Sequence, residues 1–473
     1  MPLKSWRTRS FFIELKPRSE FASLFVDCPP SGNSETGCCS NQQMQNESTG
    51  SQETVERKEM VHFREHSIEM SSIVQQRKNG ASEMLPSYWA KFGDLTLYPD
   101  SVCALTWADN HRLFMCKVRV AIGEYPLVPK TFHQLAVNVL SGMLLDEYIE
   151  NAQLLPVQAE CAECSATLLN YSSNSFSNLK LQSLPEDGWL NTSPSMEYFC
   201  RDTCGGATSH SHGHHGAHSS DLICADDVQK QWLPNEQRIV ISDSYFLVLR
   251  KMIISNAVTI DESNIVLCAK CSVEIGVILK SLFLRFYPNR NAEIVQFHHV
   301  MCNLLVTDNR KAYINTRNIF LFLIFLQVGK EFVIKLNFIN RFGTLEHFFA
   351  WTLLYQCELQ TSGKLVLRSY DKRPYLLVWL LDSYVVISQG ELVESETEGN
   401  DRLVYSFPAL KMLYKIFDAE SAKTDPRANG EDASVGILDI PLTCCVKLTE
   451  MLLESSLALP PTGRSVGQFY VCC

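Results

Sequence analysis

Two short cysteine pairs constrain this chain more than any other feature. They are Cys161-Ala-Glu-Cys164 and Cys268-Ala-Lys-Cys271, and in each the two-residue spacing lets both sulfurs of a tight turn reach the same metal ion. Zinc held by cysteine alone needs a tetrahedron of thiolates, which two such turns supply together. We therefore predict a zinc site that clamps two distant parts of a large domain. The alternative interpretation is that these are reduced cysteines packed as small hydrophobic residues.

Composition bears on the number of domains and on the kinds of partner that the protein can have. The chain has 473 residues, of which 46% are hydrophobic, and a formal net charge of -10. A core of this size suggests about two or three domains, and the acidic balance, with no basic stripe, argues against nucleic acid as a partner. The longest apolar run, Ile319 to Leu326, is well short of the roughly 20 residues that a membrane helix needs, so we expect no membrane span.

Cysteine usage indicates a reducing environment. The sequence contains 18 cysteines. Its first residues include Lys4, Arg7 and Arg9 without a following apolar stretch, so we expect no secretory signal peptide. Thiols in the cytoplasm or the nucleus serve as metal ligands, nucleophiles or core residues rather than as disulfides. We therefore expect a cytoplasmic protein, with the nucleus as the second compartment.

The hydrophobic pattern predicts an α+β protein that is mainly antiparallel β, with a zinc-braced middle and a few packed helices. Val102–Trp107 and Leu113–Val120 are strand-like runs on either side of Asp109-Asn110, which is typical of a hairpin. We expect residues 1–150 to form a mainly β amino-terminal domain. Within it, residues 31–82 are polar and contain few large apolar side chains, so we expect a disordered insertion there.

The second half of the chain contains both strand-like and helix-like stretches. Tyr375–Leu381 is apolar without polar alternation, which predicts a central strand covered on both faces. Helices are predicted over Phe348–Gln360, Ala409–Phe417 and the amphipathic Cys444–Leu457. Residues 307–338 do not fit the turn pattern of their neighbours, and we expect an inserted segment or an error of the gene prediction there.

Several motifs, taken in chain order, resemble those of the HECT-like ubiquitin ligase family. They include both cysteine pairs and continue into the apolar strand of the second half. The ordered set is fairly specific and covers roughly residues 150–460. The matching motifs are Cys161-x-x-Cys164, Leu184-Pro185-Glu186 with Trp189, Phe199-Cys200, Asp243-Ser244-Tyr245-Phe246-Leu247, Val266-Leu-Cys268-x-x-Cys271 as far as Gly276, and Leu377-Val-Trp379-Leu-Leu381-Asp382.

The resemblance implies a ubiquitin-protein ligase that binds a ubiquitin-conjugating enzyme and transfers ubiquitin to lysines of target proteins. It assigns the binding of the conjugating enzyme to the cysteine-rich, zinc-braced middle region, residues 151–300. Residues 301–473 would then be the HECT-like carboxy-terminal α+β region, so called because it resembles true HECT ligases only weakly. The partners would be the conjugating enzyme, ubiquitin and a protein substrate.

Two further features lie between the cysteine pairs. Cys200 and Cys204 are candidates for an additional metal site, where the family has adjacent cysteines followed by a histidine and this chain has Cys200-Arg-Asp-Thr-Cys204. The stretch His210–His218 places histidines among glycine and serine, which is typical of a flexible loop. It could scavenge transition metals through its imidazoles, or it could be a low-complexity insertion with no specific role.

A HECT-type reaction needs an exposed thiolate that attacks the thioester carried by the conjugating enzyme. Cys445, with Cys444 beside it, is the candidate, because Thr443-Cys444-Cys445 and the downstream Leu459-Pro460 resemble the segments around a HECT nucleophile. A position at the start of a helix would lower the pKa of the thiol. The alternative is that Cys445 is a buried core residue at a helix start.

Two classes of function remain open. In the first, the chain is a ubiquitin ligase, either through a thioester on Cys445 or by holding the conjugating enzyme so that ubiquitin passes directly to a lysine of the target. In the second, it is a non-catalytic, zinc-stabilised interaction or assembly factor that shares the fold. Both classes give the two cysteine pairs a structural role. Only the HECT-type ligase forms a reducible adduct with ubiquitin on one of its own thiols.

Overall fold

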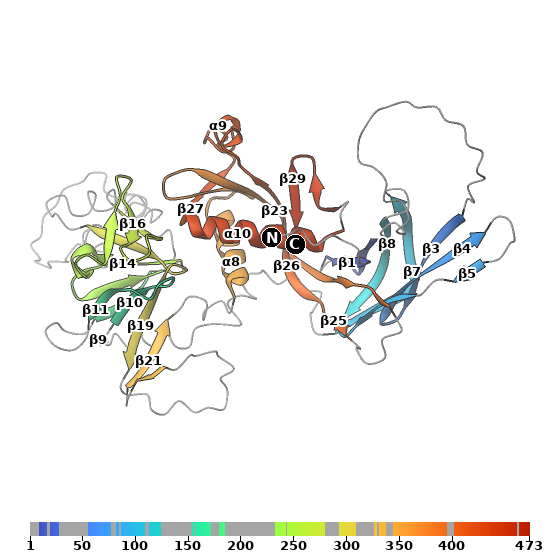
Figure 1. Ribbon diagram of the computed structural model, residues 1–473, viewed down its shortest axis with the longest axis horizontal. Coiled ribbons are helices and arrows are strands. Elements are labelled where there is room, and N and C mark those ends of the chain that lie inside the picture. The colour runs from blue at the N-terminus through green and yellow to red at the C-terminus, as the bar shows by residue number, and fades with distance from the viewer. Residues whose placement is uncertain are drawn as a thin grey trace, which may run out of the picture.

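The computed structural model of the chain is built from β-sheets, with a few helices between them (Figure 1). The strands are mostly antiparallel, which confirms the mainly antiparallel β prediction, although helix is scarcer than the α+β label suggests. The residues that the structure describes are 9–16, 19–27, 55–76, 82–84, 87–108, 113–123, 154–155, 157–171, 179–184, 232–242, 244–279, 293–308, 326–328, 331–336, 344–394, 402–460 and 463–473.

The largest sheet joins strands from both ends of the chain. Its members are β1 (Ser10–Leu15), β2 (Phe21–Asp27), β7 (Leu95–Ala108), β8 (Leu113–Ile122), β22 (Lys364–Arg368), β23 (Pro374–Glu391), β26 (Phe407–Ile416), β27 (Gly436–Asp439), β28 (Ser465–Val466) and β29 (Phe469–Cys472). The order is β28-β29-β26-β23-β1-β2-β8-β7, with β22 beside β23 and β27 beside β22. Because β1 pairs with β23 along its whole length, strands from both sides of the boundary predicted at residue 150 share one sheet.

A second sheet covers the amino-terminal strands β7 and β8. Its members are β3 (Val55–Arg64), β4 (Ser67–Gln76), β5 (Ser82–Met84), β6 (Tyr88–Phe92), β24 (Val393–Glu394) and β25 (Leu403–Val404). The predicted disorder is therefore wrong over residues 55–76, which form the β3–β4 hairpin. Ile68 and Met70 alternate with polar residues, and their fully buried side chains give this polar stretch one apolar face. Residues 31–54 of the predicted insertion lie outside the described residues.

Strands β9 to β21 form a separate group at one end of the molecule, which we call the cysteine lobe (Figure 1). One sheet has the order β11-β10-β19-β21-β20, and its members are β10 (Val157–Cys161), β11 (Thr167–Tyr171), β19 (Cys302–Asp308), β20 (Leu326–Val328) and β21 (Glu331–Leu336). The other has the order β15-β16-β17-β18-β14-β13-β12-β9, and its members are β9 (Leu154–Leu155), β12 (Leu179–Ser183), β13 (Arg238–Ile241), β14 (Tyr245–Leu249), β15 (Val258–Ile260), β16 (Ile265–Cys268), β17 (Glu274–Ile278) and β18 (Ile294–His298).

Part of the segment predicted to be inserted has a defined place in this lobe. Strands β20 and β21 fall within residues 307–338, and β21 pairs with β19 from Leu336 to Phe332. The two strands stand at the end of the sheet, so the rest of its order does not depend on them. That position is compatible with an insertion, which stays a prediction.

Helices α8 (Leu345–Leu359) and α10 (Leu442–Ala458) lie between the cysteine lobe and the largest sheet (Figure 1). The other helical elements in the described part of the chain are the short α9 (Ser421–Thr424) and the 3-10 helix η1 (Arg250–Met252), which follows β14 within the cysteine lobe. The predicted helices at 348–360 and 444–457 are confirmed by α8 and α10. The predicted helix at 409–417 is wrong, because residues 409–416 belong to β26, which pairs with β23 on one side and β29 on the other. Pairing in the tertiary structure has outweighed local propensity.

Strand β23 is the central element that the sequence predicted. Leu376, Leu377 and Val378 are successive residues whose side chains point to alternate faces, and all are at most 2% exposed. Leu376 and Val378 pack into the core shared with α8 and α10, whereas Leu377 packs on the other face against Val366. Among the described residues, no helix has the length and the apolar character required to cross a bilayer.

Candidate metal centre

The two cysteine turns have the same sequence pattern and the same backbone conformation. Each reads Cys-Ala-x-Cys-Ser, and the serines, Ser165 and Ser272, have φ angles of 55° and 59°. In the first turn the N–H of Ser165 donates to the carbonyl oxygen of Cys161 at 2.9 Å, and in the second the N–H of Ser272 donates to that of Cys268 at 2.8 Å. The left-handed serine closes each turn so that both sulfurs project to the same side.

Each turn connects two paired strands. The first joins β10 to β11, and the second joins β16 to β17, which belong to different sheets. In both turns the N–H of the leading cysteine donates 2.9 Å to the carbonyl of the residue that follows the serine, namely Ala166 or Val273. The turns are therefore fixed by the sheets themselves, and they bring together cysteines about a hundred residues apart in sequence.

The four sulfurs converge on one point. Their Sγ atoms all lie within 4.8 Å of one another. The distance from Cys161 Sγ to Cys271 Sγ is 3.7 Å, and that from Cys164 Sγ to Cys268 Sγ is 3.6 Å. A disulfide would require about 2.05 Å, whereas sulfurs bound to one zinc at about 2.3 Å in a tetrahedron are about 3.8 Å apart. The cluster therefore fits a single tetrahedral ion, as the spacing predicted.

The electrostatics of the cluster also favour a cation. Burial raises the pKa of the Cys161 thiol to about 12. Desolvation also raises the pKa of the Cys164 thiol. Hydrogen bonds from the Ala166 N–H and from neighbouring thiols outweigh it and lower that pKa to about 7. Two like charges 4 Å apart repel by about 4 kcal/mol at an effective dielectric constant of 20. The cluster can hold several thiolates together only if a cation compensates that repulsion.

The surroundings of the cluster contain contacts that no sequence motif revealed. Lys270 of the second turn donates through Nζ to the carbonyl oxygen of Cys164 at 3.2 Å, which links the turns directly. Cys302 lies opposite Cys161 in the pairing of β10 with β19. Its thiol contacts the carbonyl of Ile275 at 3.8 Å, and burial raises its pKa well above the usual value. Cys302 is therefore a packing residue behind the site and not a further ligand.

A site with four cysteine ligands suits a structural zinc ion rather than a catalytic one. Four thiolates complete the coordination of zinc and leave no open position for water or substrate, which catalytic zinc sites retain. Zinc would be held by Cys161, Cys164, Cys268 and Cys271. The other candidate ligands, Cys200 and Cys204, and the histidine-rich stretch 210–218 lie outside the described residues, so their roles stay predictions.

The candidate nucleophiles are enclosed by protein. Cys444 and Cys445 lie in the first turn of α10, as predicted, but both are 0% exposed. Burial raises the pKa of Cys445 to about 12 and that of Cys444 still higher. The sequence led us to expect that the helix start would lower these pKa values, and the loss of solvent outweighs that effect. In this conformation neither thiol meets the requirement of exposure and ionisation that a nucleophile has.

Residues from the cysteine lobe surround the start of α10. Glu274 Oε2 accepts a 2.6 Å hydrogen bond from the backbone N–H of Leu442. The Sγ atom of Cys444 lies 3.9 Å from Nδ1 of His298, which also accepts from the Val300 N–H at 3.3 Å. The contacts between the lobe and the helix join residues more than 140 positions apart, so no local pattern could have identified them.

The fold and the cysteine cluster define a β-rich protein with a candidate structural zinc site. A profile of the family described as HECT-like ubiquitin-conjugating enzyme (E2)-binding matches residues 149–471. This is more than half of the chain, and the chain belongs to that family. The matched region contains the cysteine lobe, α8 and α10, together with the carboxy-terminal strands.

Two curated relatives, one from rat and one from cattle, are named as E3 ubiquitin-protein ligases of the same type. The rat protein is 22% identical over 250 residues, which cover 51% of this chain and 57% of the relative. The bovine protein is 28% identical over 146 residues, which cover 26% of this chain and 35% of the relative. The chain thus matches little more than half the length of the rat protein and less of the bovine one. No solved structure matches the chain.

Proposed function

We propose that this chain is a ubiquitin-protein ligase that recruits a ubiquitin-conjugating enzyme to a surface braced by zinc. The observation that carries the proposal is the convergence of the four cysteine sulfurs within the region that matches the E2-binding family. The cluster joins two sheets, and its strands continue toward α10 through Glu274. Zinc would therefore hold the cysteine lobe in one shape, which a docking surface needs.

The chemistry that we propose is transfer by positioning. The ligase would hold the conjugating enzyme next to the target, so that a target lysine attacks the enzyme's thioester carbonyl and its cysteine thiolate leaves. Bringing the two reactants together in the right orientation is itself a large source of rate enhancement. The complete burial of Cys444 and Cys445 supports this route over a thioester on the chain. Ubiquitin and a protein substrate would be the other partners, in the cytoplasm or the nucleus.

A reconstituted reaction separates this mechanism from the covalent one. The full chain is incubated with activating enzyme, a panel of conjugating enzymes and ubiquitin, and gels are run with and without reductant. We expect faster conjugation to lysine, no reductant-sensitive adduct on the chain, and full activity in Cys445→Ser. A reductant-sensitive adduct that disappears in Cys445→Ser would establish the covalent mechanism instead.

The same reaction also tests whether the chain is a ligase at all. Cys161→Ser should abolish the stimulation, whereas Cys103→Ser, which changes an exposed cysteine outside the cluster, should leave it intact. A zinc-loaded wild-type protein that neither binds nor stimulates any conjugating enzyme would contradict the proposal. That outcome would favour the non-catalytic interaction or assembly factor.

A further inference from the structure

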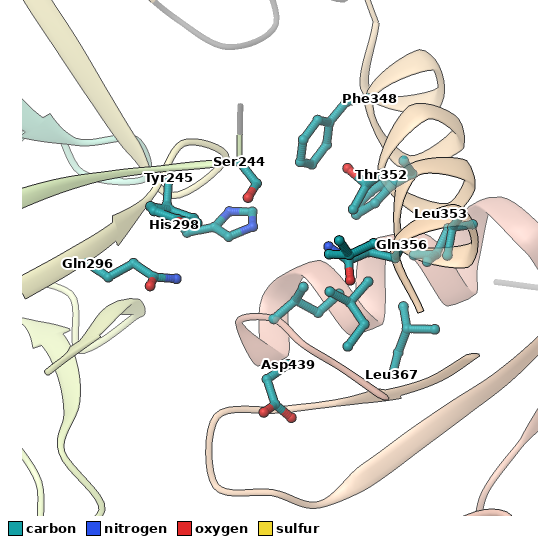
Figure 2. Close-up of a pocket in the computed structure, with 15 residues that line it drawn as sticks. Ser244, Tyr245, Gln296, His298, Phe348, Thr352, Leu353, Gln356, Leu367 and Asp439 are labelled. Atoms are coloured by element: carbon teal, nitrogen blue, oxygen red, sulfur yellow. The ribbon is translucent and has the colours of Figure 1, made fainter. Parts of the chain in front are cut away.

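A cavity of about 200 Å³ lies where the cysteine lobe meets α8 and α10. Figure 2 shows side chains of β14 and β18 on one side of it and those of α8 on the other. The deep wall is formed by buried side chains such as Phe348, Leu367 and Leu448. The side chains of Gln296 and Gln356, which also line the cavity, are partly exposed and mark its mouth.

One polar group in this apolar wall lacks a hydrogen-bond partner. Thr352 is 5% exposed, and its Oγ1 atom has no partner among the described residues. Figure 2 shows the Thr352 side chain on the face of α8 that borders the cavity. A buried hydroxyl without a hydrogen bond is uncommon in folded proteins, because it has lost its water without compensation. A ligand with a polar atom near Oγ1 would supply the missing partner.

A second polar group comes from the opposite wall. His298 is 4% exposed, and its Nδ1 atom accepts the Val300 N–H. In the neutral imidazole the proton then resides on Nε2, which makes that nitrogen a donor. Figure 2 shows the ring directed from β18 toward α8. Burial lowers the pKa of His298 to about 3, so the ring stays neutral at physiological pH.

The charge of the cavity restricts its ligand further. Among the described residues that line it, Asp439 alone is charged at neutral pH. Its carboxylate is already held by Arg368, at 2.9 Å, and by Lys372, at 2.7 Å. The cavity therefore offers no uncompensated charge to an ion. It combines an apolar wall with two buried polar groups, one of which is a neutral N–H donor.

We propose that this cavity binds a small neutral molecule with an apolar body and a carbonyl group. The carbonyl oxygen would accept hydrogen bonds from Nε2–H of His298 and from the Thr352 hydroxyl, while the apolar body would contact Phe348 and Leu367. A cavity of about 150 Å³ is sufficient for benzene, so a single ring that carries a carboxamide suits the volume here. This site is separate from the cysteine cluster and from the proposed ubiquitin chemistry.

Benzamide is a suitable probe, and the full zinc-loaded chain is the protein to use. Binding is measured by saturation-transfer NMR and titration, with toluene and benzoate as comparators of similar size. Toluene lacks the carbonyl, and benzoate carries a charge that the site does not compensate. We expect benzamide to bind about tenfold more tightly than either comparator, because only it offers a neutral carbonyl to the two buried groups. Equal binding of benzamide and toluene, or no binding of benzamide, would overturn the proposal.

A pair of isosteric variants tests the role of the hydroxyl. Thr352→Val should weaken benzamide binding about tenfold, yet it should raise the thermal stability of the ligand-free protein, because an unpartnered buried hydroxyl is removed. Thr449→Val is the matched control, since the Thr449 hydroxyl donates to the Cys445 carbonyl at 2.7 Å and does not line the cavity. Unchanged benzamide affinity in Thr352→Val would contradict the assignment.

A second variant tests the location independently of any polar group. Leu359→Trp places a larger side chain at a partly exposed lining position near the end of α8. It should block benzamide binding by filling the cavity, without changing either buried polar group. Benzamide that still binds Leu359→Trp with wild-type affinity would place the site elsewhere and refute the proposal.

Discussion

The carboxylate of Glu274 accepts a 2.6 Å hydrogen bond from the backbone N–H of Leu442, the first residue of α10. The N-cap residue of this helix, Pro441, makes no side-chain cap. Glu274 therefore satisfies one of the free N–H groups at the helix start from a distant strand. Since it begins the strand that leaves the second cysteine turn, it connects the metal centre with the helix that carries Cys444 and Cys445.

Glu274→Ala should lower the free energy of unfolding by about 1 kcal/mol, as is typical when a helix loses its cap. Glu274→Gln keeps an acceptor but loses the charge at the helix start, so its effect should be smaller, about 0.5 kcal/mol. Urea denaturation measures both. Glu450→Ala, on the exposed side of α10, is the control. If Glu274→Ala were no less stable than Glu450→Ala, the hydrogen bond would not stabilise the helix.

Gly276 is required because two backbones approach closely. A Cβ atom at this position would lie 2.0 Å from the carbonyl oxygen of Gln296 on β18. Gly276→Ala should therefore force β17 and β18 apart, at a cost of about 3 kcal/mol in stability. Gly463→Ala is the matched control, because nothing lies within 4 Å of its added Cβ. Thermal unfolding of the two variants would be compared, and equal melting temperatures would contradict this explanation of the glycine.

The contribution of Asp425 to stability should depend on pH. Hydrogen bonds from Arg427 and then Lys415 hold the pKa of this carboxyl well below its ordinary value of 3.8, although desolvation opposes them. The folded state therefore favours the ionised form, and the stabilisation is fully present above the unfolded pKa. It is lost as the pH falls below about 4 toward the lower folded pKa.

Asp425→Asn tests this linkage. At pH 7 the variant should be less stable than the wild type by about 3 kcal/mol, because two cations lose a buried partner. The difference should shrink as the pH falls below about 4. Glu431→Gln, at an exposed position, should show no such trend. The measurement is the midpoint of urea unfolding at a series of pH values. A difference between Asp425→Asn and the wild type that stays constant from neutral to strongly acidic pH would be inconsistent with the lowered pKa.

Local sequence patterns correctly predicted the elements whose structure depends mainly on residues close together in sequence. The spacing within each cysteine pair identified the metal-binding turns, and the apolar periodicity of residues 444–457 identified α10. Local sequence patterns gave wrong predictions where pairing with distant strands determines the secondary structure. Residues 409–417 were predicted to be helical, but 409–416 are extended in β26, where two neighbouring strands pair with them. The hairpin at residues 55–76 is mostly polar, and one face of alternating apolar residues is enough to fold it against β7 and β8.

The surroundings of the candidate sites could not be predicted from sequence alone. Glu274, His298 and Thr352 acquire their roles only when the cysteine lobe meets α8 and α10, and each is distant in sequence from its neighbours there. The burial of Cys445 is also a tertiary property. Its position at a helix start suggested a reactive thiol, but the core around it removes the solvent that ionisation needs.

The content of zinc per chain tests the central claim most directly. Purified protein would be exchanged into buffer with a weak chelator to remove loosely held metal, and zinc would be counted by elemental analysis. The wild type should retain one zinc more per chain than Cys161→Ser and Cys268→Ser, and both variants should lose cooperative unfolding, since structural zinc contributes on the order of 10 kcal/mol. Zinc contents that are equal in the wild type and both variants would contradict the convergence of these sulfurs on one ion.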